Sequence, residues 1–369
     1  MLELADIVRT VSPEQRTSWR LLPSQQRVLE AIEQCRTAAL GGQLYQCANC
    51  ARQLYSYHSC GNRHCPKCHG KQSAQWLEQQ RAGLLPCPHY LVTFTLPAEL
   101  RGLARAHPKV VYGLLMGCAA ASQQKLLADP QWLGAQASLL AVLHTWTRAM
   151  LYHPHVHFLV SAGGLSPDGQ QWRRPPNPNF LVPVHALSQI FRAKLRDALE
   201  HRKLSESIPA EFWQRHKKWV VHAKPAGQAE NVLEYLARYV FRIALVNSRL
   251  ERFENGQVTL RYRDNRTQQI KRVSLPTAQF LTRFLQHVLP KGFAKVRHYG
   301  LASAVCKQRR EQARALLKKD APSAWQSAPE PQGPLPPAPS EQPLGRCPYC
   351  RLGRLVWLGH LPPLRKVPP

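Results

Sequence analysis

Two Cys-x2-Cys pairs close to the N-terminus place the strongest constraint on how this chain folds. Cys47 and Cys50 form the first pair, and Cys65 and Cys68 form the second. The segment that carries them, residues 45–70, is too short to own a hydrophobic core. Two such turns present four thiolates, which is the ligand set of a tetrahedral zinc site. The spacing therefore predicts one structural Zn²⁺ held by these four cysteines, which would contribute about 10 kcal/mol or more to folding.

Further metal-ligating side chains are present outside these pairs. Cys60 and His64 lie between the two pairs, and they could bind a second ion or replace a ligand of the first. Cys347 and Cys350 form a third Cys-x2-Cys pair near the other end of the chain, but they supply only half of a tetrahedral site. If this third pair binds zinc, we expect its missing ligands to come from elsewhere in the chain or from a partner.

The charge balance points to a polyanionic partner. Lys and Arg number 50 against 22 Asp and Glu, which gives a net charge of +28. Such a balance favours nucleic acid or an anionic membrane surface. No apolar run reaches the roughly 18 residues of a membrane span, and the first residues do not show the pattern of a secretory signal. We therefore expect a bacterial cytoplasmic protein, associated with the nucleoid when bound to DNA, whose eleven cysteines do not form a disulfide framework. Seven of them, the three Cys-x2-Cys pairs and Cys60, cluster in a way that points to metal binding.

A histidine-rich segment predicts a strand with a second metal site over about residues 153–162. Because side chains alternate along a strand, His155 and His157 share one face and can bind one divalent cation. The third ligand could be His153, His144 or another polar residue brought in by the fold. Mg²⁺ or Mn²⁺ in such a site would take its remaining ligands from water and substrate oxygens. The alternative interpretation is a polar strand end near the surface.

Two tyrosines are candidates for a nucleophilic role. Tyr235 and Tyr239 lie four residues apart in a predicted helix over residues 229–243, so they share one helical face. A phenol has a pKa near 10 and is a weak nucleophile, but a metal ion that neutralises a phosphate would favour its attack. Arg238 and Arg242 flank the pair and could hold DNA phosphates. Alternatively, the tyrosines are half-buried helix residues and the arginines are solvated.

A basic predicted hairpin follows, with strands over residues 257–263 and 269–274. Arg261 and Arg263 lie on the first strand, with Tyr262 between them. Basic side chains interleaved with aromatic rings are typical of grooves that bind single-stranded DNA. A twisted hairpin with a solvated basic face explains the same pattern.

The order of predicted elements indicates an α+β fold. Strands are expected near residues 90, 155, 180, 220, 260 and 270, and their irregular spacing argues against a doubly wound parallel sheet. Helices are expected over residues 109–128, 134–143, 187–202, 229–243 and 277–289. The predicted organisation has four parts: a helical and zinc-binding DNA-binding domain over 1–85, a catalytic domain over 86–315, a Pro-rich disordered linker over 316–346 and a small knuckle over 347–369.

Several motifs, taken in order, resemble the insertion-sequence-91 family of transposases. They are Ser59-Cys60-Gly-Asn-Arg-His64-Cys65-Pro-Lys-Cys68, His144-Thr-Trp146, His153-Pro-His-Val-His157, Tyr235-x3-Tyr239 and Val288-Leu-Pro-Lys-Gly-Phe-Ala-Lys-Val-Arg-His-Tyr-Gly300. The resemblance extends from about residue 20 to residue 315.

The resemblance implies the fold and chemistry of the wider HUH endonuclease group. It implies a central antiparallel sheet that bears the histidines, with the tyrosine helix packed nearby. His155 and His157 would be metal ligands, and Tyr235 and Tyr239 would be nucleophiles that form 5′-phosphotyrosine intermediates with single-stranded transposon ends and target DNA. The mechanism would be rolling-circle transposition.

Two other functions remain open at this point. A plasmid rolling-circle replication initiator or relaxase would use the same chemistry, although the N-terminal zinc module argues against it. A catalytically inactive zinc-dependent DNA-binding protein is the non-enzymatic alternative. The intact histidine and tyrosine pairs argue against that one.

Overall fold

The protein has a mixed α+β fold with antiparallel sheets, which confirms the predicted class. The structure is a computed structural model, and it describes residues 2–68, 70–177, 179–206, 208–214, 219–226, 232–234, 236–237, 244–264, 267–319 and 345–364. The chain forms two compact units. The first unit combines Met1–His69 with Ser323–Pro369, and the second comprises Gly70–Pro322. This division differs from the expected boundary after residue 85, and it groups the expected C-terminal knuckle with the N-terminal residues.

The first unit contains a small helical core and a three-stranded sheet. Its elements are α1 (Leu4–Arg9), α2 (Pro13–Ser18), α3 (Pro23–Gln34), the 3-10 helix η1 (Ala38–Leu40), β1 (Gly42–Cys47), β2 (Gln53–Tyr57) and β13 (Leu355–Leu361). The helix α1 packs against α3, and both contribute buried side chains such as Ile7 and Ile32. The sheet has the order β13-β1-β2, with both pairs antiparallel. The C-terminal segment is therefore a strand of the same sheet as the N-terminal hairpin.

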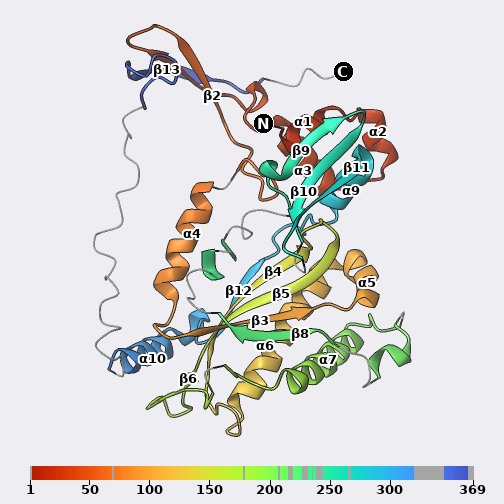
Figure 1. The fold of residues 1–369 in the computed structure, drawn as a ribbon, viewed down its shortest axis with the longest axis vertical. Coiled ribbons are helices and arrows are strands. Elements are labelled where there is room, and N and C mark those ends of the chain that lie inside the picture. Colours follow the sequence, from red (N-terminus) through yellow and green to blue (C-terminus); the bar gives the residue numbers. More distant parts are fainter. Residues whose placement is uncertain are drawn as a thin grey trace. The chain divides into compact units, whose positions relative to one another are not determined.

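The second unit is larger and is built around a five-stranded sheet (Figure 1). Its helices are α4 (Gly70–Gly83), α5 (Arg101–Ala106), α6 (Pro108–Ala128), α7 (Val184–His201), α9 (Thr277–Leu285) and α10 (Lys307–Lys319). Its strands are β3 (His89–Thr95), β4 (Ser138–Trp146), β5 (Tyr152–Ser161), β6 (Gly164–Leu165), β7 (Trp172–Arg173), β8 (Val221–Pro225), β9 (Leu250–Glu254), β10 (Gln257–Arg263), β11 (Ile270–Pro276) and β12 (Val296–Gly300). Short 3-10 helices are η2 (Ala98–Leu100), η3 (Ala210–Trp213), η4 (Asn247–Arg249) and η5 (Ala304–Cys306).

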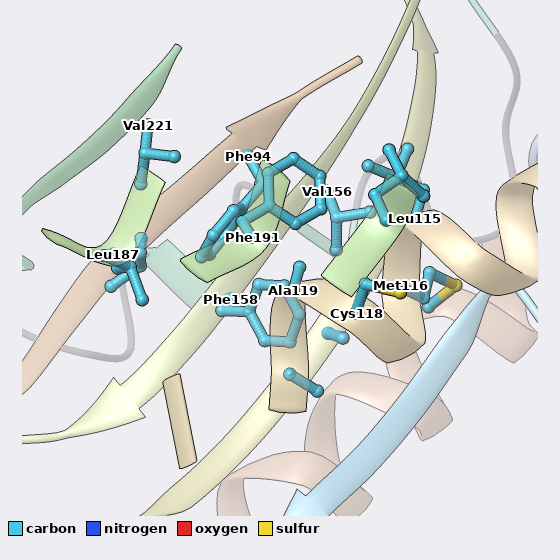
Figure 2. Close-up of a cluster of buried hydrophobic side chains, with 14 of the residues drawn as sticks. Phe94, Leu115, Met116, Cys118, Ala119, Val156, Phe158, Leu187, Phe191 and Val221 are labelled. Carbon is cyan, nitrogen blue, oxygen red and sulfur yellow. The ribbon is translucent and has the colours of Figure 1, made fainter. Parts of the chain in front are cut away.

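The central sheet has the order β12-β4-β5-β3-β8, and every neighbouring pair is antiparallel. One face forms the main hydrophobic core against α6 and α7. Figure 2 shows Phe94 and Phe158 from the sheet meeting Phe191 of α7. The rings of Phe94 and Phe191 meet edge to face with centroids 5.0 Å apart, a favoured aromatic geometry. We call this side the core face.

The opposite face of the sheet carries the histidines, and we call it the histidine face. Because side chains alternate, His155 and His157 project away from the buried Val156. Farther along the same face, Leu140 and Leu159 form a second buried cluster with Leu233. Trp76 and Leu77 of α4 are among the partly buried side chains that pack against this cluster.

Three expectations about individual elements were wrong or incomplete. Residues 134–143 were expected to be helical, but Ser138–Trp146 forms β4, whose residues are buried throughout. The expected strand near residue 180 is only an isolated bridge between Asn177 and Phe180. The basic hairpin gains a third strand, β9.

The Pro-rich segment lies mostly outside the described residues. Among the described residues, no helix is long and apolar enough to cross a bilayer.

Candidate metal centres

Three imidazoles converge on the histidine face of the central sheet. His144 lies on β4 and is paired in register with His155 on β5, and His157 follows two residues later. One ring nitrogen from each histidine lies within 4.8 Å of those of the other two. The ring centroids of His155 and His157 are 4.8 Å apart, and those of His144 and His157 are 4.7 Å apart. Three converging nitrogens fit one face of a divalent ion and leave its other positions for oxygen ligands.

Hydrogen bonds fix which nitrogen of two rings is available to a metal. The His155 Nδ1–H donates to the carbonyl oxygen of His153 at 2.7 Å, which directs its Nε2 lone pair toward the cluster. The His157 Nδ1 lies 2.8 Å from the Thr93 hydroxyl, on the strand directly beside it. Both partners orient their imidazoles, and the carbonyl also sets the tautomer of His155. Thr93 was not anticipated from the sequence, because nothing in the sequence signals which residue lies opposite His157.

The cluster is held in the neutral form that metal binding requires. Burial lowers the pKa of His155 to about 3 and that of His157 to about 4. Burial also lowers the pKa of His144, and the neighbouring His157 and His155 add to this effect. All three imidazoles are therefore uncharged at pH 7, with lone pairs available for a cation.

Of the alternatives for the third ligand, the structure brings His144 into the cluster rather than His153. The His153 Nδ1 accepts a hydrogen bond from Arg101 Nη2 at 2.7 Å. His144 is buried, and its ring stacks on that of Trp146 with centroids 4.8 Å apart. Lys295 Nζ lies 4.6 Å from the centroid of the Trp146 ring.

The predicted nucleophiles and their flanking arginines cannot be located in the same way. Tyr235, Tyr239, Arg238 and Arg242 lie outside the described residues. Their described neighbour Leu233 is fully buried in the cluster on the histidine face.

The two arginines of the basic hairpin are on its surface. Arg261 is on β10, and its Nη2 donates to the carbonyl oxygen of Ser248 at 3.2 Å. Arg263 is exposed, and its carbonyl oxygen accepts a hydrogen bond from Arg148 in the turn between β4 and β5. The end of β10 is therefore joined to the turn that connects two strands bearing the metal cluster.

The cysteines form two clusters instead of the single expected site, which corrects the predicted ligand set. Cys65 and Cys68 join Cys60 and Cys35, whereas Cys47 and Cys50 join the C-terminal pair Cys347 and Cys350. In the first cluster, the Cys68 sulfur lies 3.5 Å from that of Cys35 and 3.6 Å from that of Cys60. All eleven cysteines are free of disulfides.

The β1–β2 hairpin explains why the two expected cysteine pairs belong to different clusters. Cys47 ends β1 and Cys50 lies in the turn that follows, so this pair is at the hairpin tip. Cys60 comes shortly after Tyr57, the last residue of β2, so it lies beyond the base. Five strand residues span about 17 Å, too far for one tetrahedral site.

Cys35 completes the cluster at the base of the hairpin, and it was missed because it has no neighbouring cysteine or histidine. It is the C-cap of α3, and the adjacent Arg36 N–H donates to the carbonyl oxygen of His58. Of the two additional ligands expected, Cys60 is in the cluster and His64 is not. The Nδ1 of His64 lies 3.0 Å from Asn62 Oδ1.

The chemistry of the first cysteine cluster fits a zinc ion. Three of its four cysteines are buried. Hydrogen bonding with Cys35 raises the pKa of Cys60 to about 12 and also raises the pKa of Cys65. Four crowded sulfurs cannot all carry charge without a cation among them, and Zn²⁺ is the usual ion for four thiolates.

Two family models match parts of the chain. A family model that is named for insertion sequence 91 and described as "Transposase zinc-binding domain" matches residues 7–96. A second model, described as "Putative transposase", matches residues 139–310, which include all three clustered histidines. No solved structure matches the chain.

Two curated proteins are similar to most of the chain. "Putative transposase y4qJ" of Sinorhizobium fredii is 39% identical over 376 residues, covering 96% of this chain and 94% of that protein. The "Transposase for insertion sequence element IS801" of Pseudomonas savastanoi pv. phaseolicola is 32% identical over 297 residues, covering 74% of this chain and 69% of that protein. The order of cysteine and histidine motifs and these two matches lead to one conclusion: the chain belongs to the insertion-sequence-91 family of transposases.

Proposed function

We propose that this transposase nicks and transfers single-stranded DNA at the ends of its element by a rolling-circle mechanism. The single observation that carries the proposal is the convergence of His144, His155 and His157 on one face of an antiparallel sheet. The described residues beside the tyrosine pair support it, because Leu233 packs on that same face. Tyr235 and Tyr239 are the proposed nucleophiles.

The proposed reaction is a transesterification at a phosphodiester. The phenol oxygen of one tyrosine attacks phosphorus, the bond from phosphorus to the 3′ oxygen breaks, and the phenol proton ends on the released 3′-hydroxyl. The product is a 5′-phosphotyrosine, which keeps the phosphodiester bond energy for rejoining. A divalent ion such as Mg²⁺ or Mn²⁺, when held by the three histidines, supplies charge neutralisation at the phosphate. A second tyrosine permits a second transfer while the first holds a strand end.

The remaining residues act in binding. Arg238, Arg242, Arg261 and Arg263 are proposed to contact DNA phosphates, and Tyr262 offers an aromatic ring for a base. We place this activity in the bacterial cytoplasm, at the nucleoid. A replication initiator or relaxase would use the same residues, but the matches to transposases over most of the chain favour transposition.

The test is formation of a covalent adduct. The full-length protein is incubated with Mn²⁺ and a 3′-end-labelled single-stranded oligonucleotide from the end of the element, and the products are separated on a denaturing gel. The wild type should give a labelled protein–DNA adduct. His155→Ala and His157→Ala should abolish the adduct and leave DNA affinity nearly unchanged, because binding rests on the dispersed basic surface.

Tyrosine variants identify the nucleophile. Phenylalanine removes only the hydroxyl, so Tyr235→Phe and Tyr239→Phe should preserve the fold. Each single variant should keep some cleavage but fail in complete strand transfer, and the double variant should form no adduct. Tyr55→Phe, an exposed position in the first unit, is the matched control and should behave as wild type. An adduct that persists in the double variant would refute the assignment, and complete absence of nicking in the wild type would favour an inactive DNA-binding protein.

A further inference from the structure

A Cys-x2-Cys pair near the N-terminus meets another near the C-terminus within the first unit. The sulfurs of Cys47 and Cys350 are 3.6 Å apart, and those of Cys50 and Cys347 are 3.8 Å apart. The partners are separated by 303 and 297 residues in the chain. We infer that these four cysteines bind a second Zn²⁺, which fastens the C-terminal segment to the N-terminal hairpin as one zinc ribbon.

The sulfur spacing fits a metal site and excludes disulfides. Zn–S bonds of about 2.3 Å in a tetrahedron place neighbouring sulfurs about 3.8 Å apart. A disulfide requires about 2.05 Å. The separations of 3.6 and 3.8 Å between the sulfurs match the tetrahedral edge.

The two cysteine turns have the same backbone fold although they come from opposite ends of the chain. In the first turn, the Ala51 N–H donates to the carbonyl oxygen of Cys47 at 3.0 Å, and Ala51 has φ 56°. In the second, the Arg351 N–H donates to the carbonyl oxygen of Cys347 at 2.9 Å, and Arg351 has φ 59°. A left-handed conformation at the residue after the second cysteine is unfavourable for either side chain. Its occurrence in both turns indicates that each is shaped to present two sulfurs.

Backbone N–H groups point at the sulfurs, as expected if the sulfurs are thiolates. The N–H groups of Asn49 and Cys50 each lie 3.4 Å from the Cys47 sulfur. The Gly353 N–H lies 3.4 Å from the Cys350 sulfur. N–H groups directed at a sulfur stabilise its charged form, which is the form that binds metal.

Gly353 shows how closely the two turns approach. A Cβ atom at this position would lie 2.4 Å from the Cys47 sulfur and 2.6 Å from the Asn49 Cβ. Any larger residue would therefore push the C-terminal turn away from the N-terminal one. At the other end of the sheet, Gly41 has the same role, since its Cβ would lie 2.5 Å from the Leu361 carbonyl oxygen.

The sheet that joins the two turns cannot hold itself together by hydrophobic burial. The strand β13 pairs with β1 from Leu361 opposite Gly42 to Leu355 opposite Cys47. Most residues of β13 are exposed or half-exposed, and Trp357 is 47% exposed. A small sheet without a core needs a metal or disulfides to be stable. The zinc ion at the hairpin tip provides that stabilisation.

The first test counts zinc in the full-length protein. His155→Ala/His157→Ala is introduced throughout, so that the histidine site does not contribute metal. This parent should contain two zinc ions per chain by elemental analysis. Cys347→Ser/Cys350→Ser and Cys35→Ser/Cys68→Ser should each contain one. Cys306→Ser, which alters a cysteine outside both clusters, should still contain two. Two zinc ions in the Cys347→Ser/Cys350→Ser protein would overturn the proposal.

The second test asks whether zinc holds the C-terminal segment to the rest of the chain. Its main comparison, with and without a chelator, needs no cysteine variant. A protease site is placed in the Pro-rich stretch near residue 335 of the full chain and cut after purification. The released C-terminal piece should co-elute with the remainder on gel filtration and separate after treatment with a chelator. With Cys347→Ser/Cys350→Ser it should separate without chelator. Gly353→Ala should lower zinc content toward one per chain. Separation of the wild-type piece while zinc content stays at two would also overturn the proposal.

Discussion

At the scale of single residues, the metal-binding histidines depend on neighbours that orient them. Thr93 contacts the Nδ1 of His157 on one side, and the His153 carbonyl accepts from the Nδ1 of His155 on the other. Of these two contacts, only the first can be removed by a conservative substitution, because the second uses the backbone. Thr93 is therefore the position at which the orientation of the site can be tested without touching a ligand.

Thr93→Val keeps the shape of the side chain and removes the hydroxyl. We expect Mn²⁺ affinity at the histidine cluster to fall by about 10- to 100-fold, because a metal-binding imidazole loses the hydrogen-bond partner that orients its ring. Calorimetric titration measures the change. Thr259→Val, which removes a hydroxyl bonded to Ser274 in the basic hairpin, is the control and should leave Mn²⁺ affinity unchanged. Equal affinities in Thr93→Val and the wild type would refute the role of Thr93.

His287 should make the free energy of unfolding depend on pH, independently of metal binding. Burial lowers its pKa to about 4, and its Nε2 donates to the Met150 carbonyl oxygen at 3.2 Å. Because the folded pKa lies below the unfolded value of about 6.5, the unfolded state binds more protons between these values. The stability contribution is complete above pH 6.5 and is lost as the pH falls toward 4, at about 1.4 kcal/mol per pH unit.

Chemical unfolding from pH 7 to pH 4.5, monitored in the second unit, tests this expectation. As the pH falls, the unfolding free energy of the wild type should decrease faster than that of His287→Asn, by about 1.4 kcal/mol per pH unit. At pH 7 the variant should be the less stable of the two. His185→Asn, which makes the same change on the exposed surface of α7, is the matched control for the substitution itself. Parallel curves for His287→Asn and the wild type would show that His287 is not the group that titrates.

At the scale of elements, the central sheet separates stability from chemistry by its two faces. The core face packs on α6 and α7, and the histidine face carries the metal cluster. Phe191→Ala on α7 should cost about 3–5 kcal/mol of unfolding free energy, because it leaves a cavity against Phe94. Urea unfolding measures this loss, and Asp197→Ala on the exposed side of α7 should change it by less than about 0.5 kcal/mol. Mn²⁺ affinity of the folded Phe191→Ala protein should remain that of wild type.

The elements also show where sequence reasoning succeeds and where it stops. The strand β5 was predicted because alternation between His155, Val156 and His157 is visible in the sequence, and a period of two identifies a half-buried strand. Residues 134–143 were predicted to be helical from their Ala, Leu and Gln content, whereas Ser138–Trp146 forms β4. This strand is buried on both faces, so its apolar run shows no period of two in the sequence. One cysteine site was predicted in place of two, because the spacing of the cysteines does not show that a hairpin separates the pairs. The pairing of β1 with β13 has no local signal at all.

At the scale of the whole molecule, the charge of +28 should govern DNA binding. Affinity for single-stranded DNA should fall with salt at a log–log slope of about −0.7 for each phosphate contacted. Arg261→Ala and Arg263→Ala should each make that slope shallower by about 0.7, measured by fluorescence anisotropy. Arg192→Ala removes the same charge from α7, which packs on the core face of the central sheet, and should leave the slope unchanged. A flat response in the wild type would mean that the basic surface does not contact the DNA.

The joining of the two chain ends in one unit has a consequence for synthesis. Cys50 leaves the ribosome 297 residues ahead of Cys347, which is about 15–60 s at roughly 5–20 residues per second. Throughout that interval the N-terminal hairpin has only half of its metal ligands. A chain that stops before Cys347 never completes the ribbon, however well the rest of it folds. Completion of the first unit therefore requires that translation has passed Cys350.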